Sequence, residues 1–160
     1  MLDRVQAPQA SIIAALQLLP PAMDSRAARV MLYAAGYQES SFHAVTQYAG
    51  GPARGWWEFE EGGATAGIFA NDRLRPLAVA VCYARGVKPS VAGVQLCLAH
   101  DEVLAAAMAR LLLASDPQAL PAPIAEARAL AWACYLRNWR PGRPRPERWG
   151  GSWDAALEAM

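Results

Sequence analysis

Apolar side chains recur every three or four residues along most of this chain, and proline or glycine interrupts the pattern at short intervals. This spacing places the apolar side chains on one face of an α-helix, which is typical of helices that pack on a shared core. We therefore predict a mainly α fold. Residues 1–160 are expected to form a single domain with one short Gly-rich excursion, a loop or β-hairpin.

The predicted helices are bounded by residues that favour helix starts and stops. Helical periodicity begins after a Ser11 cap near the N-terminus, within an N-terminal helical region of residues 1–23 that Pro20 and Pro21 end. The other predicted helices cover residues 26–41 after an Asp24 or Ser25 cap, residues 76–86, residues 102–113 opened by Asp101, and residues 124–138.

Two segments do not fit the helical pattern. Residues 48–66 are rich in glycine and predict a loop or short hairpin. Residues 140–148 are rich in proline and arginine, and Ser152 then predicts the cap of one last short turn. We expect residues 140–160 to form a C-terminal strap followed by this short helix.

Composition excludes several classes of protein. The chain of 160 residues is 54% hydrophobic and 18% charged, which is too apolar for a disordered protein. The net charge is +1, carried by 14 arginines and one lysine against 14 acidic residues. No global positive field exists to attract nucleic acid, so any partner must be recognised by a local patch.

The cysteines predict neither a disulfide framework nor a metal site. Cys82, Cys97 and Cys134 are an odd and sparse set, as expected for a protein that folds in a reducing compartment. Cys97 and His100 have the spacing of a metal-binding pair, but the chain lacks a second short Cys/His pair. We expect no metal and no cofactor.

The N-terminal region predicts neither a signal peptide nor a membrane span. Asp3 and Arg4 cancel the positive charge that a signal peptide needs. The longest uncharged stretch, residues 7–23, contains three prolines and several polar residues. We expect a protein without its own export signal.

Glu39 is the residue that most directly suggests chemistry. It lies four residues after Ala35 and seven after Leu32, so it continues the apolar stripe of the predicted helix. Burial and the negative end of the helix dipole both disfavour an ionised carboxylate there. A carboxyl group that keeps its proton near neutral pH is what a general acid for glycosidic cleavage requires. The alternative is a glutamate at a frayed helix end, with its carboxylate in water.

Two motifs around Glu39 resemble a known family. ESSFH at residues 39–43 is followed by GPARGWWEF at residues 51–59. The pair resembles the lysozyme-like superfamily, above all soluble lytic transglycosylases and goose-type lysozymes, in which an ESxF helix end precedes GAxGLMQ at nearly this spacing. Small bacteriophage-encoded members of the superfamily are similar.

The resemblance implies roles for individual residues. Glu39 matches the catalytic glutamate, and Ser40 matches the serine beside it. Later in the chain, ACY at 133–135 and PGR at 141–143, with Trp149 after them, are similar to the family's AxYNAGPGR segment, so Tyr135 is the candidate for the tyrosine that faces the glutamate. By the same resemblance, residues 53–58 form the floor of the sugar cleft. The substrate-binding residues that it implies are Ser40, Gly55, Trp56, Trp57, Glu58 and Tyr135.

The chain departs from the family pattern at three points. Glu58 stands where the family has glutamine, and one extra residue separates Glu39 from Gly55. Asn138 comes three residues after Tyr135 rather than directly after it. A carboxylate at position 58 raises the pKa of Glu39 if the two are close, or acts as a base itself, or points away.

The activity implied by the resemblance is cleavage of peptidoglycan glycan strands between N-acetylmuramic acid and N-acetylglucosamine. Glu39 is expected to act as the single acid and base of a lytic transglycosylase, with hydrolysis as the other possible outcome. The protein is then expected to be made in the host cytoplasm and to act at the periplasmic wall, as a virion component or after the inner membrane is breached, with other virion proteins as further partners. The alternative is a non-catalytic phage structural or assembly protein that retains a lysozyme-like scaffold.

Two further groups of residues have open interpretations. Trp56, Trp57 and Tyr48 offer flat faces that stack on sugar rings or simply fill the core. The arginines of residues 137–145 belong to a solvated strap, to a surface for a protein or wall polymer, or to a site for single-stranded nucleic acid. We expect the strap, and nucleic acid is the least favoured partner.

Overall fold

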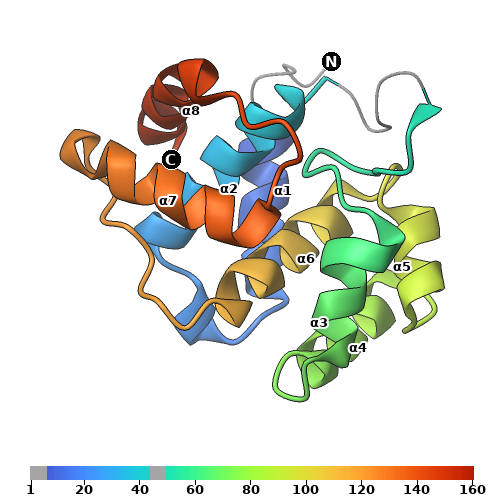
Figure 1. Cartoon of the computed structure of the whole chain (residues 1–160). Helices are drawn as coiled ribbons and strands as arrows, with labels where there is room; N and C mark the ends of the chain where they lie inside the picture. The colour runs from blue at the N-terminus through green and yellow to red at the C-terminus, as the bar shows by residue number, and fades with distance from the viewer. Residues whose placement is uncertain (1–6, 44–49) are drawn as a thin grey trace.

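Helix α6 (Glu102–Ser115) is the central helix of the structure, and its side chains are buried from Leu104 through Leu113. The computed structural model describes residues 7–43 and 50–160, and within these ranges it contains α-helices and short helical turns but no strand (Figure 1). The prediction of a mainly α chain is confirmed. The α-helices around α6 are α1 (Ala7–Gln17), α2 (Arg26–Ser40), α3 (Ala66–Ala70), α4 (Arg75–Arg85), α5 (Val91–Cys97), α7 (Arg128–Trp139) and α8 (Pro146–Ala159).

The predicted caps account for the ends of three helices. The Ser25 hydroxyl accepts the Ala28 N–H at 3.1 Å and begins α2, and the Asp101 carboxylate accepts the Leu104 N–H at 2.9 Å and begins α6. Gly86 ends α4 in the left-handed region with φ 67°, a conformation that glycine adopts without strain. These ends are local events, which is why the sequence predicts them.

Two predicted caps are wrong. Ser11 lies inside α1, which begins at Ala7. Ser152 lies inside α8, which begins six residues earlier at Pro146, because a proline is already in a helical conformation at the first position. The C-terminal element is therefore a helix of 14 residues rather than a short turn.

Three smaller departures concern short elements. The last predicted helix begins as an α-helix only at Arg128, after the 3₁₀ turn η4 (Ala125–Ala127). The 3₁₀ turn η1 (Pro21–Met23) follows α1, and the sequence pattern did not predict α3 or α5. These elements are short, so few apolar positions exist to reveal their period.

In its described part, residues 50–66, the Gly-rich excursion begins as a loop with one antiparallel bridge, between Arg54 and Phe59. A one-turn π-helix, η3 (Glu61–Thr65), continues it toward α3. Tyr48, a predicted sugar-stacking residue, lies outside the described residues. Among the described helices none is long and apolar enough to cross a lipid bilayer.

Helix α8 returns the end of the chain to α2. The two helices make the most extensive contact between any pair of elements and lie side by side in Figure 1. Trp153 and Ala156 on α8 are fully buried, as are Met31 and Ala35 on α2. This packing holds the C-terminal end of α2, which carries Glu39, against the segment that joins α7 to α8.

Candidate active site

A cleft of about 1170 Å³ lies beside the C-terminal end of α2. Its walls come from the end of α2, the Gly-rich loop, η3 and α3, the end of α6, the end of α7 and residues 140–145. Glu39, Glu58 and Tyr135 all line it, so the structure brings these three predicted site residues together.

Glu39 lies in the last turn of α2 and is half-buried. Burial raises the pKa of its carboxyl group, a hydrogen bond from Tyr135 lowers it, and the nearby carboxyl of Glu58 raises it again. The result is a pKa of about 7, so a large fraction of Glu39 is protonated at neutral pH. Arg145 is near enough to favour the ionised form slightly.

Tyr135 approaches Glu39 from α7. Its side chain is 3% exposed, and its hydroxyl donates a hydrogen bond to Oε1 of Glu39. The ring is held between aromatic neighbours, with centroids 5.2 Å from those of Trp132 and Trp149 and 5.9 Å from that of Trp139. Burial and the Glu39 carboxyl both raise the pKa of Tyr135, so the phenol remains a donor.

Glu58 reaches the site because of the turn that carries it. Arg54 and Phe59 exchange two backbone hydrogen bonds of 2.9 Å, and the four residues between them form a tight loop. Gly55 opens that loop with φ 75°, and a Cβ there would lie 3.0 Å from the Leu98 carbonyl oxygen, so the position requires glycine. Glu58 closes it with φ 51°, a conformation that a non-glycine residue rarely adopts.

The carboxyl groups of Glu58 and Glu39 both line the cleft and lie close enough for each to shift the pKa of the other. Burial raises the pKa of Glu58, while Glu39, Arg145 and Arg148 lower it. Two adjacent carboxyl groups cannot both ionise without repulsion, so they titrate as a pair. The structure therefore supports the first of the sequence-based alternatives for Glu58, that it lies next to Glu39 and raises its pKa.

The Ser40 hydroxyl forms hydrogen bonds with backbone groups of the protein. Its hydroxyl donates to the Trp56 carbonyl oxygen at 2.8 Å and accepts the Phe42 N–H at 3.1 Å. This bond ties the end of α2 to the Gly-rich loop. Ser40 thus fixes the distance between the elements that carry Glu39 and Glu58, which differs from the substrate contact implied by the family resemblance.

Trp56 and Trp57 fill the core and do not line the cleft. They are 8% and 1% exposed, and Nε1 of Trp57 donates to the Leu32 carbonyl oxygen at 2.9 Å inside the protein. Both rings pack edge-on against Phe42. Of the two interpretations of these tryptophans, burial favours core packing over sugar stacking, because packing under α2 removes their faces from solvent. Gly55 is likewise buried and acts through backbone shape.

Trp139 is the aromatic residue that the cleft exposes in their place. It lies at the end of α7, it is partly exposed, and its Nε1 donates to the Trp57 carbonyl oxygen at 3.2 Å. Sequence reasoning singled out the arginines around it and gave it no role in the cleft. The helical spacing of Trp132, Tyr135 and Trp139 on one face of α7 was the available signal.

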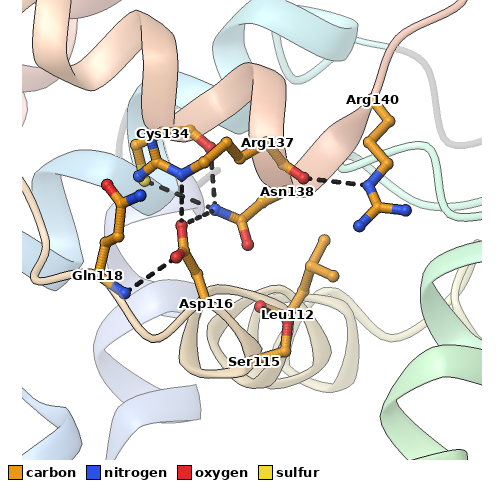
Figure 2. A network of polar contacts seen from close by, with 8 residues as sticks. All are labelled: Leu112, Ser115, Asp116, Gln118, Cys134, Arg137, Asn138 and Arg140. Atoms are coloured by element: carbon orange, nitrogen blue, oxygen red, sulfur yellow. Dashed lines mark hydrogen bonds and ion pairs between the residues drawn. The ribbon is translucent and has the colours of Figure 1, made fainter.

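Asp116 is a second cleft carboxyl group that sequence reasoning missed. It follows α6, its side chain is 7% exposed, and it accepts hydrogen bonds of 3.0 to 3.1 Å from Arg137, Asn138 and the Gln118 N–H (Figure 2). Burial alone would raise the pKa of Asp116, but these donors outweigh it and the pKa lies below its usual value. Asp116 is thus ionised and bonded within the protein.

No group of three histidine, cysteine or acidic side chains among the described residues has the arrangement of a metal site. The side chains of the cleft offer general acid chemistry. The carboxyl group of Glu39 lies beside that of Glu58, and the Tyr135 phenol orients Glu39.

Comparison of the chain with protein-family models, with curated proteins and with solved structures finds no match. The geometry of the cleft is consequently the basis for assigning a function.

Proposed function

We propose that this protein is a lysozyme-like enzyme that cleaves peptidoglycan glycan strands between N-acetylmuramic acid and N-acetylglucosamine. The observation that carries the proposal is Glu39, a half-buried carboxyl group with a pKa of about 7 in the wall of a cleft of about 1170 Å³. A cleft of this size exceeds the usual volume of a small-ligand pocket, roughly 300–1000 Å³, and suits several linked sugars.

In the proposed reaction Glu39 donates its proton to the glycosidic oxygen, and the bond from that oxygen to the muramic carbon breaks. Positive charge develops at the muramic carbon and is stabilised by the substrate's own N-acetyl group. The 6-hydroxyl of the same muramic residue then forms a bond to that carbon and returns its proton to Glu39. The products are a 1,6-anhydro sugar and a free N-acetylglucosamine hydroxyl, and the enzyme regains its starting protonation.

The position of Glu58 favours this transglycosylase route over inverting hydrolysis. An inverting glycosidase separates its two carboxyl groups by about 6.5–9.5 Å so that water fits between them. Glu58 instead lies close enough to Glu39 for each carboxyl group to shift the pKa of the other, and we infer a separation shorter than the one an inverting pair needs. Asp116 is bonded to Arg137 and Asn138 and is poorly placed to serve as a base.

The proposal is tested with isolated peptidoglycan sacculi and mass spectrometry of the released fragments. Wild-type protein should release muropeptides with anhydro termini, which lack one water relative to hydrolysis products. Glu39→Gln should reduce release by about 10³-fold, because general acid catalysis contributes roughly 10²–10⁴-fold. Glu158→Gln, an exposed carboxyl on α8, is the matched control and should retain activity.

A second candidate function is a non-catalytic structural or assembly protein that retains this scaffold, with virion proteins as partners. Two observations favour it: the Ser40 hydroxyl is used internally, and Glu39 is already bonded to Tyr135. The same experiment separates the candidates. Equal inactivity of wild type and Glu39→Gln on sacculi would overturn the enzymatic proposal and favour the structural role.

A further inference from the structure

The proposed reaction uses the arginine-rich wall of the cleft only through the effect of Arg145 on the pKa of Glu39 and Glu58. Four of the residues that line the cleft are arginines, although the whole chain has a net charge of only +1. Arg137 is paired with Asp116. We call residues 140–145, which carry the other three at positions 140, 143 and 145, the arginine segment; all three are exposed. Within the described part of the chain, no hydrogen bond or ion pair engages the Arg143 side chain.

The arginine segment is anchored at both ends. At its start the Arg140 N–H donates to the Leu136 carbonyl oxygen at 3.1 Å, and the Arg140 Nε donates to the Arg137 carbonyl oxygen at 3.2 Å. At its end the Arg145 carbonyl oxygen accepts a 3.0 Å hydrogen bond from Gln38, which is 2% exposed. Two prolines at positions 141 and 144 restrict the backbone between these anchors.

These anchors order the backbone of the arginine segment before any ligand binds. The guanidinium groups project from a backbone that is already ordered, so a ligand does not bear the entropy of ordering the segment. Ser152 reinforces the anchor, because its hydroxyl donates to Gln38 at 2.9 Å inside the protein. The buried pair of Gln38 and Ser152 thus supports an exposed row of cations beside the cleft.

The charges in the cleft also limit which anion fits. Besides the arginines, the cleft is lined by the carboxyl groups of Glu39, Glu58, Glu60 and Asp116. A densely charged polymer such as nucleic acid would place phosphates near these carboxyl groups as well as near the arginines. A glycan that carries one carboxylate at intervals can instead place its anions on the arginine segment and its neutral rings beside the carboxyl groups.

We propose that the arginine segment binds carboxylates carried by the glycan strand, so that the cleft selects strands with free stem-peptide carboxylates over neutral ones. Guanidinium groups bind carboxylates with two parallel hydrogen bonds, a geometry that an ammonium group lacks. The proposal rests on the proposed function, because it names the substrate feature that the same cleft recognises. Arg143 and Arg140 are the specificity-determining residues.

The test measures binding in a Glu39→Gln background, where strands are not cleaved. The probes are soluble peptidoglycan strands with free carboxylates and the same strands after amidation of those carboxylates. We expect the free strands to bind at least tenfold more tightly, and Arg140→Gln/Arg143→Gln to remove about tenfold of that affinity while leaving the amidated strands unaffected. Arg75→Gln removes one positive charge outside the cleft and is the control for the single variant Arg143→Gln, which should lose affinity for the free strands where Arg75→Gln does not.

The outcomes are distinct. Equal affinity for the two strands, or an equal loss in Arg75→Gln, would overturn the proposal, and so would tighter binding of a single-stranded oligonucleotide than of the free strands. If the double variant fails to fold by circular dichroism, the single Arg143→Gln variant decides by the same criteria. If Glu39→Gln binds free strands more tightly than amidated ones but the wild type does not cleave sacculi, this proposal is supported and the proposed function is overturned. If the wild type cleaves sacculi but Glu39→Gln binds both strands equally, the proposed function is supported and this proposal is overturned.

Discussion

Glu39 and Asp116 are two carboxyl groups of one cleft with opposite protonation. Both lose contact with water, and burial raises the pKa of each. Asp116 receives a guanidinium, an amide and a backbone N–H, so its pKa falls below 3.8. Glu39 receives one phenol and faces another carboxyl group, so its pKa rises to about 7. The hydrogen-bond donors and charges around these two carboxyl groups, rather than burial alone, therefore decide which of them holds a proton.

The two residues also affect folding with opposite dependence on pH. The pKa of Asp116 is lower in the folded state, so its stabilisation is present above about 4 and is lost as the pH falls through the folded value. The pKa of Glu39 is higher in the folded state, so stability is retained below its unfolded value of about 4.5 and is lost as the pH rises through about 7. Glu39, proposed to transfer protons, and Asp116, bonded within the protein, thus change the folding stability in opposite directions as the pH rises.

Removal of Asp116 should have the largest effect on stability. Asp116→Ala leaves the partly buried Arg137 without its ion pair and Asn138 with only the Cys134 carbonyl oxygen as an oxygen acceptor, and we expect a loss of about 2–3 kcal/mol in the free energy of unfolding. Urea denaturation at neutral pH measures it. Asp72→Ala, whose ion pair with Arg75 is exposed, should change stability by less than about 0.5 kcal/mol. Similar losses in both variants would contradict the comparison.

Replacement of Glu39 should stabilise the protein under alkaline conditions while removing activity. Glu39→Gln eliminates a carboxylate that is ionised unfavourably at about pH 8, and we expect a melting temperature roughly 4 °C above that of wild type. The difference should vanish near pH 4.5, where wild-type Glu39 is protonated. Thermal melts followed by circular dichroism across this range provide the measurement, and a lower melting temperature at about pH 8 would refute the assignment.

Loss of the Tyr135 hydroxyl should widen the difference in pKa between Glu39 and Asp116. Tyr135→Phe keeps the aromatic packing with Trp132 and Trp149 but removes the donor, so the pKa of Glu39 should rise by about one unit. Carbon-13 NMR titration of the labelled carboxyl group follows this shift directly. An unchanged pKa would mean that the hydroxyl does not stabilise the ionised form.

Replacement of Glu58 should narrow the difference in pKa between Glu39 and Asp116. Glu58→Gln removes the like charge and supplies an amide donor, and we expect the pKa of Glu39 to fall by about half a unit to one unit. The alkaline limb of the activity profile should move to lower pH by the same amount. Glu60→Gln, an exposed neighbour, serves as the control for the pKa. A larger shift in the control would show that Glu58 is not the coupled partner.

Local sequence signals explain most of the helices and part of the site. The Ser25 and Asp101 caps and the Gly86 stop involve residues within one turn of each helix end, so a short window of sequence contains the whole interaction. Glu39 was recognised from its helical spacing on α2 together with the two motifs at residues 39–43 and 51–59, which are also close to it in the sequence.

Other features join residues too distant for such a window. Tyr135 reaches Glu39 across 96 positions, and Ser152 reaches Gln38 across 114. Asp116 acquires its donors from α7 only after α6 and α7 have packed. The same limit applies to Trp56 and Trp57, whose aromatic character suits either a core or a sugar platform until the burial is known.

The sequence by itself determined the helical class of this protein, most of its helix boundaries and the candidacy of Glu39, because these depend on spacing and capping within a few residues. Tertiary structure alone decided which acid holds a proton, which tryptophan faces the cleft and where the arginine segment is anchored. Solvation and hydrogen bonding at these sites arise from groups that only the folded chain brings together.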